Sequence, residues 1–162
     1  MAANAYLTLV GQKQGAITGS VTEKTREGSI LVHAFNNQIL SPRDPTSGLP
    51  TGKRQHMPVV ILKEIDRSSV PLWNALVNNE NLTTWVLRFW ATAANGVMQQ
   101  IYSITLTNAN VASIEEYMVD NTVAANASLP MMERITFSYQ KIQWVWNVPP
   151  LTAQDDWSTP VT

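Results

Sequence analysis

The strand-like segment at residues 135–146 constrains the fold more than any other part of the sequence. Apolar side chains occupy its odd-numbered positions at first, and its even-numbered positions after Lys141. The two series are Ile135, Phe137 and Tyr139, and then Ile142, Trp144 and Trp146. Alternate residues of a strand face opposite sides of a sheet. The change of phase therefore predicts either a β-bulge or a strand that crosses from one sheet to another.

Strand-length apolar segments separated by turn residues fill much of the remaining chain. They lie at residues 6–10, 15–21, 30–39, 59–62, 85–92, 102–107 and 111–118. The unbroken apolar run at 59–62 predicts a strand buried on both faces. Asn95-Gly96 predicts a two-residue hairpin turn.

One short helix is expected after residue 68. Asp66, Ser68 and Ser69 are candidates for its N-cap, and Pro71 is tolerated only in a first turn. Apolar residues then recur at helical spacing as far as Val77, and the helix is expected to end at Asn78 and Asn79. About ten residues of helix cannot stand alone, so this helix must pack on a sheet.

The expected fold class is therefore mainly β. We expect a two-sheet β-barrel or sandwich, one short α-helix packed against it and a long extended loop. All of this is expected to form a single domain over residues 1–162, since the length suits one domain. Residues 147–162 hold three prolines and are expected to form an extended C-terminal tail that Trp157 anchors.

Composition excludes several classes of function. Charged residues make up only 14% of the chain, where about 25% is usual, and the net charge of −1 provides no basic field for nucleic acid. Cysteine is absent, so neither a disulfide nor a thiolate nucleophile can form. We expect no secretory signal peptide at the N-terminus and no membrane insertion. So few charges favour a protein that covers part of its surface in an assembly.

Residues 41–56 form the longest stretch without periodicity, and their three prolines and two glycines exclude regular helix or strand. Residues 48–54 superficially resemble a phosphate-binding loop, but the glycine spacing is one residue short and Arg54 replaces the magnesium-binding Ser or Thr. Loops of this length are usually functional or disordered. Because no catalytic chemistry is available to this loop, contact with another chain is its leading function.

Catalytic and cofactor sites are not expected. His33 and His56 lack the spacing of a metal site, and His33 is expected to be structural. The adjacent acidic pairs at 115–116 and 155–156 would point to opposite sides of a strand, so we interpret them as solvated charge. The six tryptophans leave a ligand-binding β-barrel or lectin-like module as an alternative, although most lie in strand patterns typical of a core or a subunit interface.

Several motifs resemble the Hcp (haemolysin-coregulated protein) family, which forms the inner tube of bacterial type VI secretion systems. They include Arg43-Asp44 through Gly48, Gly52-Lys53-Arg54, His56 and Pro58, together with Lys63-Glu64-Ile65-Asp66, Leu106-Thr107-Asn108-Ala109, the strand from Phe137 to Trp144, and Asp156-Trp157. The resemblance covers nearly the whole chain.

This resemblance implies a non-enzymatic structural subunit without a cofactor. Such a subunit is made in the cytoplasm, assembles into homohexameric rings that stack into a tube, and is expelled by contraction of a sheath. The implied partners are other copies of the chain, sheath proteins, a VgrG-type spike and small effector proteins carried in the lumen. A phage tail-tube protein would share the fold. The residues expected at the subunit interface lie in the loop: Arg43, Asp44, Gly48, Gly52, Lys53, Arg54 and His56. Arg54→Glu is expected to weaken ring formation or stacking.

Overall fold

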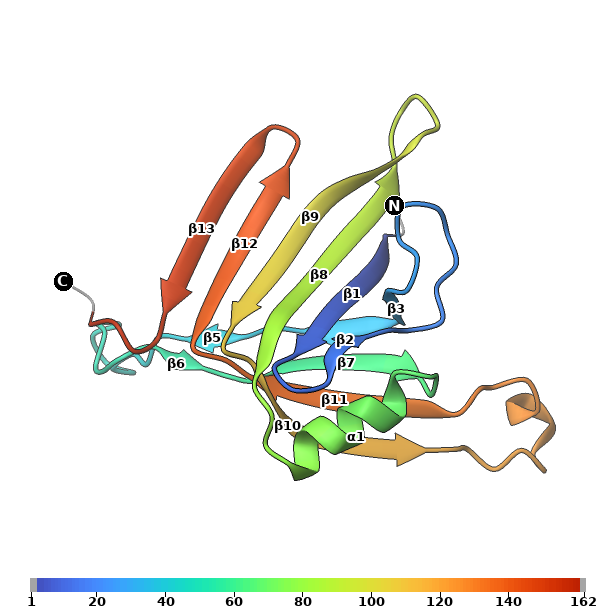
Figure 1. Ribbon diagram of the computed structural model, residues 1–162. Coiled ribbons are helices and arrows are strands. Elements are labelled where there is room, and N and C mark those ends of the chain that lie inside the picture. The colour runs from blue at the N-terminus through green and yellow to red at the C-terminus, as the bar shows by residue number, and fades with distance from the viewer. Residues whose placement is uncertain (1–2, 161–162) are drawn as a thin grey trace.

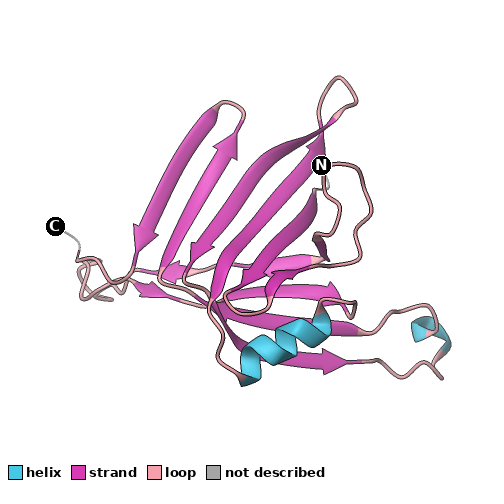
Figure 2. Ribbon diagram, in the orientation of Figure 1, coloured by secondary structure: helices cyan, strands magenta, loops and turns pink. Residues whose placement is uncertain are grey.

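The computed structural model describes residues 3–160, and antiparallel strands dominate it (Figure 1). Figure 2 shows how little of the chain is helical. The strands are β1 (Asn4–Gly11), β2 (Gly15–Ile17), β3 (Ile30–Val32), β4 (Ala34–Asn36), β5 (Ile39–Leu40), β6 (Gln55–His56), β7 (Val59–Glu64), β8 (Leu82–Thr92), β9 (Met98–Thr107), β10 (Asn110–Tyr117), β11 (Met132–Ser138), β12 (Lys141–Asn147) and β13 (Pro150–Asp156). One α-helix, α1 (Ser69–Val77), and one short 3₁₀ helix, η1 (Ala124–Asn126), complete the elements.

The strands form two main sheets and one small one. The seven-stranded sheet has the order β13-β12-β9-β8-β1-β2, and β3 also pairs with β1. The four-stranded sheet has the order β10-β11-β7-β4, and β5 pairs with β6 alone. In Figure 1 the long strands of the larger sheet stand upright above the four-stranded sheet. The expected fold class, with two sheets and one short helix, is confirmed.

Three strand-to-strand corners carry the chain from one main sheet to the other, and α1 provides a fourth passage, from β7 to β8. The first is His33, whose backbone N–H donates to the Leu62 carbonyl at 2.8 Å between β3 and β4. The second is Asn108 between β9 and β10, which adopts a left-handed φ of 51°. The third lies between β11 and β12 at Tyr139 and Gln140. The phase change in residues 135–146 therefore marks a crossing between sheets, which was one of its two predicted explanations.

The core lies between the sheets. Leu7, Leu87 and Ile104 of the larger sheet and Ile61 and Ile135 of the smaller one are almost fully buried. Trp85 and Phe137 join the two layers edge to face, with ring centroids 5.4 Å apart. Burial of these side chains on one face of each sheet explains why the two layers stay together.

Helix α1 covers one side of this core. Leu72 and Ala75 are buried, and the helix contacts β10. Pro71 lies in the first turn, where its missing N–H costs no hydrogen bond. Asn79 ends the helix in a left-handed conformation with φ of 50°, so the predicted start and end are confirmed.

Four expectations about single segments are wrong. Residues 59–62 alternate between buried and half-buried positions, because only one face of β7 meets the core. The turn at Asn95-Gly96 is a three-residue loop closed by hydrogen-bonded Ala93 and Val97, in which Gly96 has a φ of +81°. The strand expected at 15–21 is shorter, since β2 ends at Ile17, and the strand expected at 30–39 is divided among β3, β4 and β5. The expected tail contains a full edge strand, β13, paired along its length with β12.

Candidate functional site

The loop at 41–56 is an ordered hairpin. Its stem consists of β5 and β6, in which Ile39 pairs with His56 and Leu40 pairs with Gln55. Further along, Arg43 and Pro50 form an isolated β-bridge, and the Thr51 N–H donates to the Pro42 carbonyl at 3.0 Å. We call residues 39–56 the arm. In Figure 1 it projects from the body close to the C-terminus.

The tip of the arm is held by its own hydrogen bonds. The Asp44 carboxylate accepts from the backbone N–H groups of Thr46 at 2.6 Å and Ser47 at 3.2 Å. These bonds lower the pKa of Asp44. Gly48 follows with a φ of +72°, a conformation that favours glycine, and its N–H donates to the Asp44 carbonyl at 2.8 Å. Asp44 and Gly48 therefore shape the tip.

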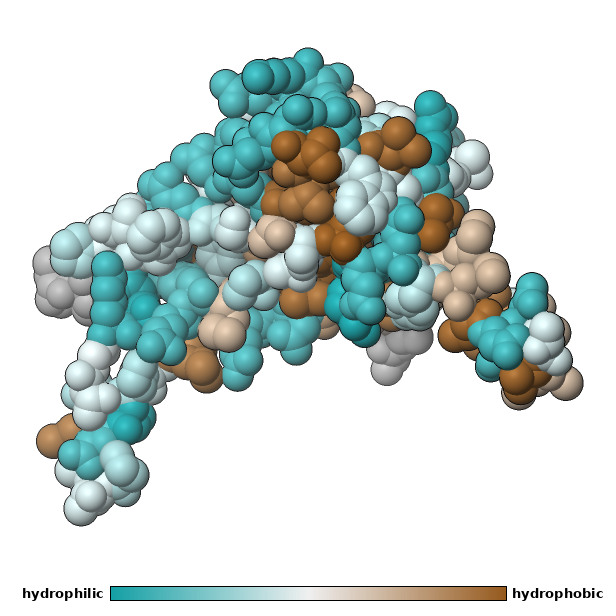
Figure 3. Space-filling model, turned by 90° about the horizontal axis from the view of Figure 1, so that it is seen from below, coloured by the Kyte–Doolittle hydropathy of each residue, from teal (hydrophilic) through white to brown (hydrophobic). Residues whose placement is uncertain are grey.

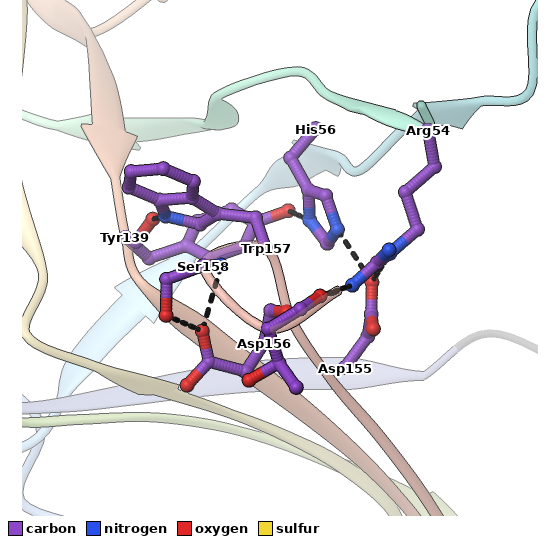
Figure 4. Close-up of polar contacts among 8 residues, drawn as sticks. Arg54, His56, Tyr139, Asp155, Asp156, Trp157 and Ser158 are labelled. Atoms are coloured by element: carbon purple, nitrogen blue, oxygen red, sulfur yellow. Dashed lines mark hydrogen bonds and ion pairs between the residues drawn. The ribbon is translucent and has the colours of Figure 1, made fainter. Parts of the chain in front are cut away.

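The base of the arm is fastened to the last strand of the larger sheet (Figure 4). His56 lies between Tyr139 and Asp155, with its Nδ1 2.9 Å from the Tyr139 hydroxyl and its Nε2 2.6 Å from Asp155 Oδ2. The Arg54 Nε also donates to Asp155 Oδ2. We call Arg54, His56, Tyr139 and Asp155 the base cluster. Two side chains of the arm thus converge on one carboxylate of β13.

The base cluster continues into the residues after β13. The Arg54 Nη2 donates to the carbonyls of Asp156 at 2.8 Å and Thr159 at 3.2 Å. The Trp157 indole donates to the Tyr139 carbonyl at 2.6 Å, which confirms the expected anchoring role of Trp157. The arm, the β11–β12 corner and the C-terminal segment therefore meet at one place.

The charges in the base cluster are strongly paired. Hydrogen bonds from Arg54, and then from His56, lower the pKa of Asp155, although partial burial acts in the opposite direction. Burial raises the pKa of Tyr139 to about 12, so its hydroxyl stays protonated at neutral pH. The His56 side chain is only 6% exposed. Such an arrangement stabilises a contact and leaves no free nucleophile or base for catalysis.

The predicted interface residues divide into three groups. Asp44 and Gly48 build the tip, while Arg54 and His56 bind the body of the same chain. Arg43, Gly52 and Lys53 are exposed on the arm, although the Arg43 Nη1 lies 3.4 Å from the Gly48 carbonyl. Gly52, Lys53 and Arg54 line a groove of about 730 Å³ beside the arm, together with Ile39, Ser41, Pro50 and Pro160.

Tyr139 and Asp155 were not predicted as partners of the arm. Asp155 was interpreted as solvated charge, and that interpretation is wrong because Arg54 and His56 bind it. The signal available in the sequence was the presence of two basic side chains in the loop and two acids near the C-terminus. About a hundred residues separate them, so no local spacing could pair them.

The other candidate residues have structural surroundings. His33 lies 3.2 Å from Glu64 on the surface, as an ion pair if protonated, and no cluster of metal-binding side chains exists among residues 3–160. Glu115 and Glu116 are exposed, as expected. Of the tryptophans, Trp85 is fully buried and Trp146 is partly exposed.

Within the described part of the chain, no helix has the length and apolar character needed to cross a membrane.

Exposed apolar side chains occur at both projecting ends of the molecule, as well as on α1 and the β12–β13 hairpin. The arm carries Leu49, which is 64% exposed. The segment between β10 and β11, residues 118–131, carries Met118, Val123, Leu129 and Met131. Figure 3 shows the two ends as projections on opposite sides of one face, with brown apolar atoms at the end formed by the second segment. The two ends therefore differ in shape and composition.

The comparisons with known proteins agree with this architecture along nearly the whole chain. The family model described as "Type VI secretion system effector, Hcp" matches residues 6–146. The chain belongs to the Hcp family. Hcp proteins are non-enzymatic, structural, secreted proteins of type VI secretion systems.

Individual Hcp relatives show the same extent of similarity. The "Major exported protein" of Pseudomonas aeruginosa is 36% identical, and the match covers 99% of each chain. A crystal structure of an Hcp protein has a TM-score of 0.90 at 26% identity and covers 98% of this chain and 100% of that one. The secreted protein Hcp3 of Pseudomonas aeruginosa has a TM-score of 0.79 at 29% identity, and the match covers 98% of this chain and 100% of that one.

Proposed function

We propose that this Hcp protein is the subunit of the inner tube of a type VI secretion system. In this proposal six copies form a ring, rings stack into a tube, and contraction of a sheath expels the tube. Effector proteins travel in the lumen, and a VgrG-type spike and the sheath are the further partners. The subunit is made in the cytoplasm and leaves the cell by this route.

The structural observation that carries the proposal is the arm. It is rigid at both ends, since hydrogen bonds close its tip and the base cluster fastens its stem. Nevertheless it buries little of its own surface, and Leu49 is exposed at its tip. Ordering a projection costs conformational entropy that contacts within a monomer do not return. Contact with a neighbouring subunit supplies the missing burial.

The two dissimilar ends support a ring. A contact between a patch and a different patch on the next copy is heterologous, and heterologous contacts close into rings when the rotation permits. The arm at one side and residues 118–131 at the other provide such a pair of patches. A low proportion of charged residues suits a surface that is covered on assembly.

The proposal is tested by the native mass of purified variants. Arg54→Glu, the obvious substitution, also breaks the base cluster, so a change in assembly would have two causes. Lys53→Glu combined with Leu49→Ser alters only exposed side chains of the arm. Lys24→Glu, which lies on the exposed loop before β3, is the matched charge control.

Multi-angle light scattering is expected to give a mass near six subunits for both the wild type and the Lys24→Glu control. The arm variant is expected to lose at least about ten-fold of its assembled fraction, because less than 2 kcal/mol of interface energy already produces such a change. A wild type that stays monomeric at high concentration would contradict the ring. An arm variant with unchanged mass would remove the arm from the interface.

A further inference from the structure

The base cluster joins two parts of the molecule that otherwise hardly touch. The arm pairs only with itself through β5 and β6, and it belongs to neither main sheet. β13 is the edge strand of the larger sheet and pairs only with β12. Asp155 of β13 receives both Arg54 and His56. The stem continues the β4–β7 pairing through the Met57 N–H, which donates to the Gln38 carbonyl at 3.0 Å. Asp155 adds the side-chain contacts that hold the arm against the sheet edge (Figure 4).

The tip and the base of the arm are held by different kinds of contact. Asp44 and Gly48 hold the tip of the arm by bonds within the arm, so the tip keeps its shape if the base opens. The base depends on side-chain contacts to Asp155 and Tyr139 and on backbone carbonyls after β13. Loss of these contacts would free a preformed arm to swing about its stem.

The surroundings of the cluster favour opening as a unit. Two grooves flank the arm at its base: one of about 470 Å³ includes His56, Tyr139 and Trp157 in its walls, and the other of about 730 Å³ includes Arg54 and Lys53. Apolar packing at the base is limited to Ile39, which lies partly buried against the core, and to the edge-on contact of His56 with the Tyr139 ring. Trp157 binds the Tyr139 carbonyl, and the Trp157 N–H donates to the Gln140 carbonyl at 3.2 Å, so the C-terminal segment would loosen together with the stem.

We propose that the base cluster is a latch that sets the angle of the arm, and that subunits assemble only when this latch is closed. Asp155 is its positioning residue, since it contacts no neighbouring subunit in this scheme and acts through Arg54 and His56. The assembly part of this inference rests on the proposed function, whereas the latch itself can be measured within one subunit.

The first test uses Asp155→Asn, which keeps the shape of the side chain and removes its charge. Glu27→Gln, which neutralises an exposed acid on the loop before β3, is the matched control. Hydrogen–deuterium exchange of Asp155→Asn is expected to rise at least about ten-fold at the Trp157 amide, because the C-terminal segment loosens when the latch opens. Exchange at the Gly48 and Met57 amides is expected to stay unchanged, because these amides are bonded within the arm and across its stem. Unchanged exchange at Trp157 overturns the latch.

The second test closes the latch covalently. The chain has no cysteine, so Arg54→Cys with Asp155→Cys introduces a unique pair that a short bismaleimide can bridge. The uncrosslinked double variant and Asp155→Asn are expected to lose at least about ten-fold of their assembled fraction by light scattering, and the bridged form is expected to recover it. A bridged form that stays unassembled, or an Asp155→Asn protein with wild-type mass, overturns the link to assembly. A monomeric wild type would defeat the proposed function while the exchange experiment still decides the latch.

Discussion

At the scale of single residues, the buried pair of Lys63 and Glu133 bears most directly on stability. Both side chains are fully buried, and the Lys63 Nζ lies 2.5 Å from Glu133 Oε1 and 2.9 Å from Asp66 Oδ1. The Ser69 hydroxyl also donates to Glu133, so this network joins β7, β11 and the start of α1. Lys63, Asp66 and Ser69 lie close together in the sequence, around the start of the helix. Their partner Glu133 lies far along the chain, so the sequence alone did not predict this network.

Removal of one member of this pair leaves the other charge buried without its partner. Lys63→Met is expected to lower the free energy of unfolding by about 3–5 kcal/mol. The double variant Lys63→Met/Glu133→Leu is expected to be closer to the wild type, because the fully buried carboxylate is removed together with the ammonium group. Asp66 also loses Lys63 in both variants, but its side chain is partly exposed to water. Urea unfolding followed by tryptophan fluorescence measures both. A double variant less stable than Lys63→Met would contradict this account.

Asp155 provides a prediction about pH. Its pKa is lowered in the folded protein, chiefly by the hydrogen bond from Arg54. Its stabilising contribution is therefore fully present above the unfolded value of about 3.9, and it is lost as the pH falls through the lowered value. Asp44, Asp66, Asp120 and Asp156 have lowered pKa values too, so acid destabilises the wild type through several groups.

Comparison with Asp155→Asn isolates the contribution of Asp155. The difference in free energy of unfolding between the wild type and Asp155→Asn is expected to be about 1–3 kcal/mol between pH 5 and 7. It should shrink below pH 4, where the Asp155 carboxylate of the unfolded chain becomes protonated before that of the folded protein. Urea titrations from pH 3 to 7 measure it. A difference that does not change with pH would contradict a contribution from the charge of Asp155.

At the scale of elements, local sequence patterns predicted the features that depend on residues close together in the chain. The start of α1 shortly before Pro71 and the crossing after Ser138 follow from side-chain periodicity and backbone preferences. β13 was not predicted, because the three prolines of residues 147–162 favour an irregular tail. Only Pro150 lies in β13, where it is tolerated as the first residue of an edge strand. The fastening of the arm was missed because Arg54 and Asp155 meet only through the tertiary fold.

The loop before β3 provides a prediction at the same scale. It approaches β3 so closely that a Cβ on Gly19 would lie 2.8 Å from the Ile30 Cα and closer still to the Ser29 carbonyl oxygen. Gly19→Ala is expected to cost about 1–3 kcal/mol of stability, because backbone atoms must shift. Gly52→Ala is the control, since no atom lies within 4 Å of its added Cβ. Thermal unfolding of the two variants compares them, and equal midpoints would contradict the close approach.

At the scale of the whole molecule, the decisive property is that the two projecting ends differ. The arm presents Leu49 and Lys53, and the other end presents Leu129 and Met131. If these ends form a heterologous contact, a variant damaged at one end keeps the other end intact. Two variants damaged at opposite ends can then form one good contact with each other, but neither can extend the chain further.

We therefore expect a defined product when two variants are mixed. Lys53→Glu/Leu49→Ser and Leu129→Ser/Met131→Ser should each be monomeric alone, because each lacks one half of every contact. An equimolar mixture should form heterodimers and stop, since the free ends of the pair are both damaged. Light scattering measures the mass, and native mass spectrometry distinguishes mixed from identical pairs. Rings formed by Leu129→Ser/Met131→Ser alone would show that the arm meets a surface other than residues 118–131. A mixture that stays monomeric would contradict a contact between these two ends.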